Sequence, residues 1–231
     1  AKGEVIITSA GLPARPSEIE YVACALPDWE GAFNTSLRFK NWSFSMQWDG
    51  KVGGMTYSQS HHKMCEQGHL AETLNGRKPG TSLYLDIADP DVLKLFEKQK
   101  ITPVAGVYCI APGVVDNGDG TYSPNQKLVT LESYYKEYYR IGNVETNTFS
   151  TTYLKLREVR LDYQLPKSWL KNTFINNASV GIYGRNLLCI TSYPMYDPET
   201  TSLDGNTFVP GVEVGTLPTS RSWGVNLKVD F

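Results

Sequence analysis

All three histidines and one of the four cysteines lie between residues 61 and 69. If this segment is helical, His62, Cys65 and His69 share one face at i, i+3 and i+7 and offer a zinc ion three ligands. A polar turn in an exposed loop explains the same residues, because Gly68 interrupts a helix and no fourth ligand stands out. His62, Cys65 and His69 are therefore the metal-ligand candidates, although the prediction for the chain is no metal and no other cofactor.

A second candidate cation site is the segment 116–121, which reads Asp-Asn-Gly-Asp-Gly-Thr and is similar to the start of a calcium loop. Gly118 stands where the EF-hand pattern requires Asp or Asn, and no Glu follows at the twelfth position. The tip of a glycine-rich hairpin explains the segment better than a calcium site does.

Four tyrosines, Tyr134, Tyr135, Tyr138 and Tyr139, follow the i, i+4 spacing of a helix. Packing in a core is one use of such rings, and stacking on a sugar or peptide ligand is another. They are the candidate substrate-binding residues.

No GxSxG, GxGxxG or Walker motif occurs, and no pair of carboxylates can be argued from spacing, so the chain is not expected to be an enzyme.

The segments that must position these residues alternate between apolar and polar side chains. In the last one, Trp223, Val225, Leu227, Val229 and Phe231 share a face, and Ser222, Gly224, Asn226, Lys228 and Asp230 share the other. We expect strands at about 31–39, 41–49, 153–165, 178–190 and 221–231. Each is close to the 9 to 11 residues that a tilted strand needs to cross a bilayer.

This pattern predicts an all-β fold, the strands and outer loops of a large antiparallel transmembrane barrel. The alternative is a secreted, soluble β-sandwich that binds carbohydrate, although sandwich strands average roughly 5 to 6 residues. A net charge of −2 and the lack of a basic tract give no support to nucleic-acid binding. The scattered cysteines indicate neither a disulfide framework nor a CxxC metal site.

Strand parity gives a topology in which short and long connections separate. If Phe231 points into the periplasm, residues 40–41 and 166–177 are inner connections, and 50–150 and 191–220 are long extracellular loops. The first of these loops is long enough to carry its own structure, with short helices expected at 89–98 and 133–140. Five strands cannot close a barrel, because about eight is the practical minimum. The chain also starts at Ala1 without a signal peptide, so we expect a processed protein or a part of a longer one.

Several motifs, in order, resemble the C-terminal portion of the SusC/RagA family, the TonB-dependent outer-membrane transporters of Bacteroidota. They are the Pro-Asp-Trp-Glu-Gly-Ala-Phe-Asn-Thr segment of residues 27–35, Leu-Arg-Glu-Val-Arg-Leu-Asp-Tyr-Gln-Leu-Pro at 156–166, Gly-Arg-Asn-Leu-Leu at 184–188, Tyr-Asp-Pro-Glu at 196–199 and the final strand from Pro218 to Phe231. Residues 1–24 and much of 50–150 carry no such signature.

The resemblance implies a Gram-negative outer membrane and a plugged barrel of about 22 strands. It implies import of an oligosaccharide or oligopeptide, with a SusD-like lipoprotein as a lid. TonB would act through a plug that is absent from this chain. The remaining barrel strands and outer-membrane lipid are further expected partners of this chain. The terminal residues Gly224, Leu227, Val229 and Phe231 resemble the signal read by barrel-insertion machinery.

Overall fold

The computed structural model describes residues 3–15, 19–199, 202–204 and 207–231. The chain divides into two compact units, Ala1–Val22 with Tyr57–Thr148 and Ala23–Thr56 with Phe149–Phe231. We call the first the helical unit and the second the sheet unit. Two short strands, β4 (Met55–Ser58) and β9 (Thr148–Ser150), lie where the chain passes between the units.

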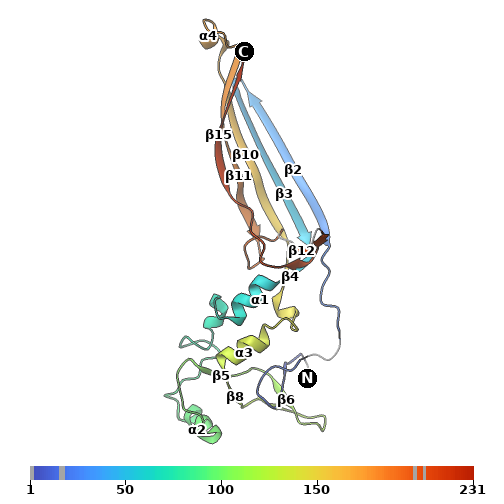
Figure 1. Ribbon diagram of the computed structural model, residues 1–231, viewed down its shortest axis with the longest axis vertical. Coiled ribbons are helices and arrows are strands. Elements are labelled where there is room, and N and C mark those ends of the chain that lie inside the picture. The colour runs from blue at the N-terminus through green and yellow to red at the C-terminus, as the bar shows by residue number, and fades with distance from the viewer. Residues whose placement is uncertain (1–2, 16–18, 200–201, 205–206) are drawn as a thin grey trace. The chain divides into compact units, whose positions relative to one another are not determined.

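The sheet unit is built on one antiparallel sheet with the strand order β15-β11-β10-β3-β2 (Figure 1). These strands are β2 (Pro27–Phe39), β3 (Trp42–Gly53), β10 (Tyr153–Gln164), β11 (Asn177–Thr191) and β15 (Ser222–Asp230). β2 and β3 extend beyond the expected 31–39 and 41–49, because their pairing continues through Trp29 opposite Val52 and Pro27 opposite Gly53. Backbone pairing needs no apolar side chain, so alternation alone underestimates these strands.

The connections at the two ends of this sheet differ in length. At one end β2 turns into β3 through Lys40, whose φ of 52° lies in the left-handed region, and Asn41. The C-terminus and the short helix α4 (Lys167–Leu170), between β10 and β11, lie at this end. At the other end β11 and β15 are joined by residues 192–221, which contain β12 (Ser202–Asp204), β13 (Thr207–Val209) and β14 (Val212–Glu213). Short and long connections therefore lie at opposite ends of the sheet.

A β-bulge in β10 explains a change in the phase of its sequence pattern. The register of β10 with both β3 and β11 shifts between Leu156 and Glu158. Apolar residues fall on even numbers before the bulge, at Leu154 and Leu156, and on odd numbers after it, at Val159 and Leu161. Because a bulge adds one residue to one strand, both segments keep their apolar side chains on the same face.

The helical unit contains short elements around one core. Its helices are α1 (Gln59–Glu66), η1 (Ala71–Leu74), α2 (Pro90–Gln99), α3 (Leu131–Tyr138) and η2 (Glu145–Asn147), and its strands are β1 (Ile6–Ile7), β5 (Tyr108–Ile110), β6 (Val114–Asp116), β7 (Tyr122–Pro124) and β8 (Leu128–Thr130). Its core contains Ile7, Leu83, Cys109, Ala111, Val129, Leu131, Tyr134 and Tyr135. The segment expected as a loop at 50–150 thus begins with four residues of strand β3 and continues into this unit.

Both helices expected in this segment are present with small shifts. The Asp89 side chain accepts a hydrogen bond from the Asp91 amide at the start of α2, and Lys100 ends it with a φ of 55°. Thr130 caps α3, which begins two residues before the expected 133, at Leu131. None of the helices in the described ranges is long and apolar enough to cross a membrane.

Candidate functional site

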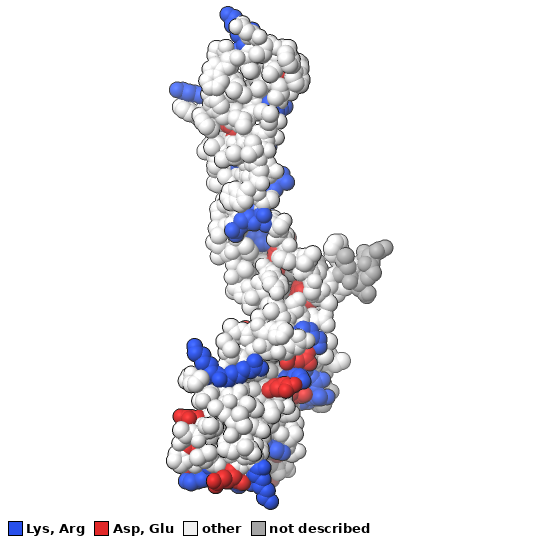
Figure 2. Space-filling view, turned by 60° about the vertical axis from the view of Figure 1, so that its left-hand side comes forward, with Lys and Arg blue, Asp and Glu red and all other residues white. Residues whose placement is uncertain are grey.

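One face of the five-stranded sheet carries exposed apolar side chains. Phe33, Ile182 and Trp223 are 58%, 59% and 72% exposed. The same face includes Leu37, Phe39, Trp42, Leu154, Val180, Val225 and Leu227, all of them exposed. Figure 2 shows mostly uncharged atoms over the strands in this view. An apolar surface on five adjacent strands is larger than water-exposed proteins normally carry, which indicates an apolar environment.

Aromatic side chains gather at the hairpin end of this face. Trp42 lies opposite both Phe39 of β2 and Tyr163 of β10, and its ring centroid is 4.7 Å from that of Tyr163. The terminal Phe231 stacks on Phe174 at 5.5 Å. Aromatic girdles at the edge of the apolar band are typical of membrane barrels, since these rings favour the interface between lipid and water.

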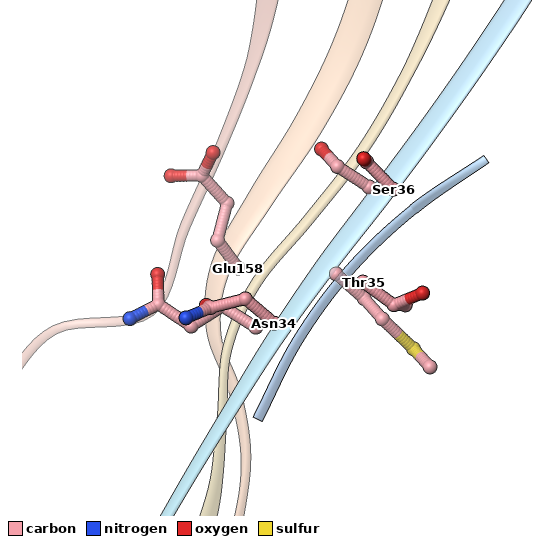
Figure 3. A pocket seen from close by; sticks show the side chains of 7 residues that line it. Asn34, Thr35, Ser36 and Glu158 are labelled. Atoms are coloured by element: carbon pink, nitrogen blue, oxygen red, sulfur yellow. The ribbon is translucent and has the colours of Figure 1, made fainter. Parts of the chain in front are cut away.

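The opposite face of the sheet is polar and carries paired charges. Arg160 Nε lies 2.6 Å from Asp162 Oδ2, and Arg185 Nε lies 2.8 Å from Glu158 Oε2. A shallow hollow of about 260 Å³ is lined on this face by Asn34, Ser36, Ser45, Gln47 and Glu158. Figure 3 shows Asn34 and Glu158 pointing to one side of the sheet and Thr35 to the other. The sheet therefore separates an apolar side from a hydrogen-bonding side.

A buried charge network joins the polar face to the long connection after β11. Lys155 Nζ of β10 lies 2.6 Å from Asp197 Oδ1 and also donates to Glu199 Oε2. Arg157, at the bulge, donates to Glu199 and to Asp49 of β3, the latter at 2.5 Å. Tyr153 donates its hydroxyl hydrogen to Glu199 at 2.8 Å. We call Asp49, Tyr153, Lys155, Arg157, Asp197 and Glu199 the charge network.

Two carboxylates of the charge network, Asp197 and Glu199, have lowered pKa values. Burial acts to raise the pKa of Asp197, but hydrogen bonds from Lys155 and Thr219 outweigh it and bring the pKa to about 2. For Glu199 burial acts in the same direction, and donors from Arg157, Lys155 and Tyr153 lower its pKa overall. A buried cation that faces two ionised carboxylates has its charge compensated, which is the condition for burying it at all.

Sequence reasoning did not single out this network. The sequence features that belong to it are Lys155 in an alternating strand and the Tyr-Asp-Pro-Glu motif. About forty residues of chain separate the two. Only the pairing of β10 with β11 brings the two together.

The four candidate tyrosines lie together in the helical unit. Tyr134 stacks on Tyr138 and Tyr135 on Tyr139, both at interplanar angles of 22°, as the i, i+4 spacing predicted. Tyr134 and Tyr135 are buried, and burial raises the pKa of Tyr135 to about 12. All four line a hollow of about 510 Å³ together with Ala71, Glu72, Leu74, Asn75, Thr81 and Leu83. We call it the tyrosine hollow.

The candidate metal ligands His62, Cys65 and His69 do not share one helical face in the structure. Helix α1 ends at Glu66, so His69 is not on the helix, and its side chain is exposed. His62 Nδ1 lies 3.0 Å from the Tyr57 hydroxyl, and its Nε2 lies 3.4 Å from Glu66. The structure instead brings together His61, Cys65 and Glu72, whose ligand atoms all lie within 4.8 Å of one another. Two of these residues were not among the candidates: His61, one turn before Cys65 on α1, and Glu72, which comes from η1.

The segment 116–121 forms the tip of the β6–β7 hairpin. Asp116 accepts a hydrogen bond from the Gly118 amide, and Asp119 accepts from the amide and hydroxyl of Thr121. These bonds hold the turn itself, as the hairpin interpretation expected.

The four cysteines form no disulfide in the structure, which describes all four; Cys24 and Cys189 are exposed, whereas Cys65 and Cys109 are buried.

The final strand places its candidate signal residues on both faces. Leu227, Val229 and Phe231 follow the apolar face, whereas Gly224 lies opposite Tyr183 of β11. A Cβ atom on Gly224 would lie 2.4 Å from the ring of Tyr183. The glycine thus has a packing role, because the ring lies across its backbone.

Comparisons with known proteins agree with this architecture. No family model matches the chain. TonB-dependent receptor P3 of Formosa agariphila is 23% identical over 212 residues, covering 89% of this chain and 16% of the relative. TonB-dependent receptor P26 of the same organism is 23% identical over 210 residues, covering 89% and 17%. The chain spans about a sixth of the length of these curated relatives.

Two solved structures have a similar fold. The RagAB peptide importer in its closed-closed state matches with a TM-score of 0.55 and 16% identity over 98% of this chain and 21% of that chain. The open-open state matches with a TM-score of 0.51 and 16% identity over 98% and 20%. The chain is similar to a part of TonB-dependent receptors, and its fold is similar to a part of the RagAB chain. Its open five-stranded antiparallel sheet matches a part of a β-barrel, which favours the barrel prediction over the soluble sandwich.

Proposed function

We propose that the chain is the C-terminal part of an outer-membrane importer, in which its sheet forms wall strands and its long connections form the outer surface. The observation that carries this proposal is the sheet with an exposed apolar face on one side and paired charges on the other. In a barrel wall the first face meets lipid and the second meets the aqueous lumen. The proposed location is the outer membrane of a Gram-negative bacterium of the Bacteroidota type.

The distribution of the connections supports the orientation. Bacterial barrels have short periplasmic turns and long extracellular loops. The Lys40 turn and the C-terminus lie at the end with short connections, and residues 192–221 lie at the other. We assign the first end to the periplasm, so that 57–148 and 192–221 belong to the extracellular side.

The cargo and the partners follow from this placement. A SusD-like lipoprotein would cover the outer surface, and TonB would act through a plug domain outside this sequence. The named RagAB relatives are a peptide importer, which favours an oligopeptide cargo over an oligosaccharide. The tyrosine hollow supplies aromatic faces that suit either cargo, and Tyr138 and Tyr139 are its more accessible rings.

Uptake by cells that produce the complete receptor tests this function. We expect accumulation of a labelled oligopeptide that stops when the proton-motive force is collapsed or the lid lipoprotein is removed. An oligosaccharide of matched mass serves as the second arm and decides the cargo class. Uptake of neither compound, or uptake that is independent of the proton-motive force, contradicts the proposed function.

The role of the hollow is tested separately with Tyr138→Ala. If the ring contacts cargo, cargo affinity falls by about 0.5–1.5 kcal/mol, the usual contribution of an aromatic contact. The matched control is Tyr122→Ala, which removes an exposed tyrosine of the β6–β7 hairpin that does not line the hollow. Equal uptake kinetics in both variants would show that Tyr138 does not contact cargo.

A further inference from the structure

Three side chains of different chemistry converge at one point of the helical unit. His61 and Cys65 lie one turn apart on α1 and are 1% and 0% exposed. Cys65 Sγ lies 3.6 Å from His61 Nε2, and Glu72 Oε2 of η1 lies 3.4 Å from the same nitrogen. Zinc bonds of about 2.0–2.3 Å at tetrahedral angles place neighbouring ligand atoms about 3.3–3.6 Å apart. Both separations from His61 Nε2 already match a zinc ligand set, and all three ligand atoms lie within 4.8 Å of one another.

The surrounding hydrogen bonds fix which nitrogen of His61 faces this point. His61 Nδ1 lies 3.0 Å from Asn147 Oδ1, and the Asn147 Nδ2 donates to the Tyr139 carbonyl at 2.9 Å. The second bond sets the orientation of the amide, so Oδ1 is the atom that faces the imidazole. An amide oxygen only accepts, so Nδ1 is the nitrogen that donates to Asn147, and Nε2 is the nitrogen that faces Cys65 and Glu72 and could bind a metal. Imidazole ligands of metals are commonly oriented by such a second bond.

The carboxylate is oriented in a similar way. The Tyr139 hydroxyl donates to Glu72 Oε2 at 3.1 Å, and the Tyr135 hydroxyl donates to the Glu72 carbonyl at 3.4 Å. Glu72 is half-exposed and also lines the tyrosine hollow, so the cluster has a route to solvent. A thiol sulfur, an imidazole nitrogen and a carboxylate oxygen together favour zinc over the hard cations calcium and magnesium.

We propose that His61, Cys65 and Glu72 bind a zinc ion, with Asn147 and Tyr139 orienting two of the ligands. The cysteine gives up its thiol proton to solvent as the metal binds, because the thiolate is the ligand form. Three protein ligands leave a fourth tetrahedral position for water or for a donor group of a bound molecule. Such a site links α1 to η1 beside the tyrosine hollow. It stands independently of the proposed import function, since its readouts do not require transport.

The test is metal binding by the complete receptor, purified in detergent and stripped with a chelator. We expect it to take up zinc and, with cobalt as the probe, to develop a thiolate-to-cobalt charge-transfer band. Cys65→Ser should abolish the band. Glu72→Gln, a change at a half-exposed residue that keeps the side-chain shape, should weaken zinc binding roughly tenfold or more.

Two control variants separate this site from adventitious binding. His69→Ala removes an exposed imidazole from the same segment, and Cys189→Ser removes an exposed thiol of the sheet unit. Both should leave the cobalt band and the zinc affinity unchanged. Circular dichroism of each variant confirms that it is folded. The proposal would be overturned if the parent receptor shows no cobalt band. It would also be overturned if Glu72→Gln and Cys65→Ser have the zinc affinity and cobalt spectrum of the parent receptor. Either result would leave a metal-free hydrogen-bonded cluster.

Discussion

Lys155 Nζ on strand β10 lies 2.6 Å from Asp197 Oδ1 on the connection between β11 and β15, and both side chains are only 3% exposed. This ion pair fastens a long connection to the polar face of the sheet. Asp197 also accepts hydrogen bonds from the amide and hydroxyl of Thr219, which lies near the other end of the same connection. One buried carboxylate thus holds the wall strand and both ends of the connection together.

Replacing Lys155 by Met should destabilise the receptor. Asp197 would remain buried without its cation, whereas Glu199 would keep Arg157. Breaking a buried ion pair on one side costs about 3–5 kcal/mol. Chemical unfolding of the receptor in detergent measures the loss. Arg185→Gln is the control, because its 60% exposed side chain pairs with Glu158 at the surface and such pairs contribute roughly 0–1 kcal/mol. Equal losses in the two variants would contradict a buried anchor at Lys155.

The charge network should also make stability depend on acid. The pKa of Asp197 in the folded chain is about 2, below its ordinary value of 3.8, since the donors from Lys155 and Thr219 outweigh burial. A carboxylate with a lowered pKa contributes its full stabilisation above the ordinary value and loses it as the pH falls toward the folded value. Unfolding midpoints should therefore be constant down to about pH 4 and fall between pH 4 and pH 2. In Asp197→Asn this acid-dependent part should shrink; an unchanged acid profile would show that Asp197 is not its source.

Much of the wall could be predicted from the sequence, because alternation reports directly which face a strand residue occupies. The shared face of Trp42, Phe44 and Met46 could be assigned from the sequence alone. The extra length of β2, the bulge at Arg157 and the charge network could not be found in this way, since they depend on pairing between distant segments. The cluster of His61, Cys65 and Glu72 could not be found from helical spacing alone, because Glu72 approaches from another element.

A charge on the apolar face of the sheet should oppose membrane insertion. Leu161 lies between Phe44 of β3 and Ile182 of β11 on that face. Leu161→Arg is expected to cost about 2–4 kcal/mol, the range for arginine at the bilayer midplane. Gln47→Arg places the same side chain on the polar face beside Glu158 and should have little effect. The free energy of folding of each variant can be measured in lipid vesicles as a function of urea concentration. Similar free energies for the two variants would argue against a lipid-facing side.

The terminal residue offers a test of the assembly signal. We propose that Gly224, Leu227, Val229 and Phe231 are read by the barrel-insertion machinery, and we expect deletion of Phe231 to lower the amount of receptor inserted. Transport per inserted molecule should not change. Because Phe231 also stacks on Phe174, Phe174→Ala removes the ring contact and keeps the terminal aromatic. Insertion reduced equally by both changes would assign the effect to packing, and normal insertion after the deletion would exclude the signal.

If the five-stranded sheet separates lipid from an aqueous lumen, spin labels along β3 of the complete receptor in lipid will detect this separation. Single labels at 43–48 report collisions with oxygen, which concentrates in lipid, and with a water-soluble nickel complex. We expect a period of two, with labels at Phe44, Met46 and Trp48 accessible to oxygen and labels at Ser43, Ser45 and Gln47 accessible to nickel. The opposite phase, or six labels with no alternation, would contradict it.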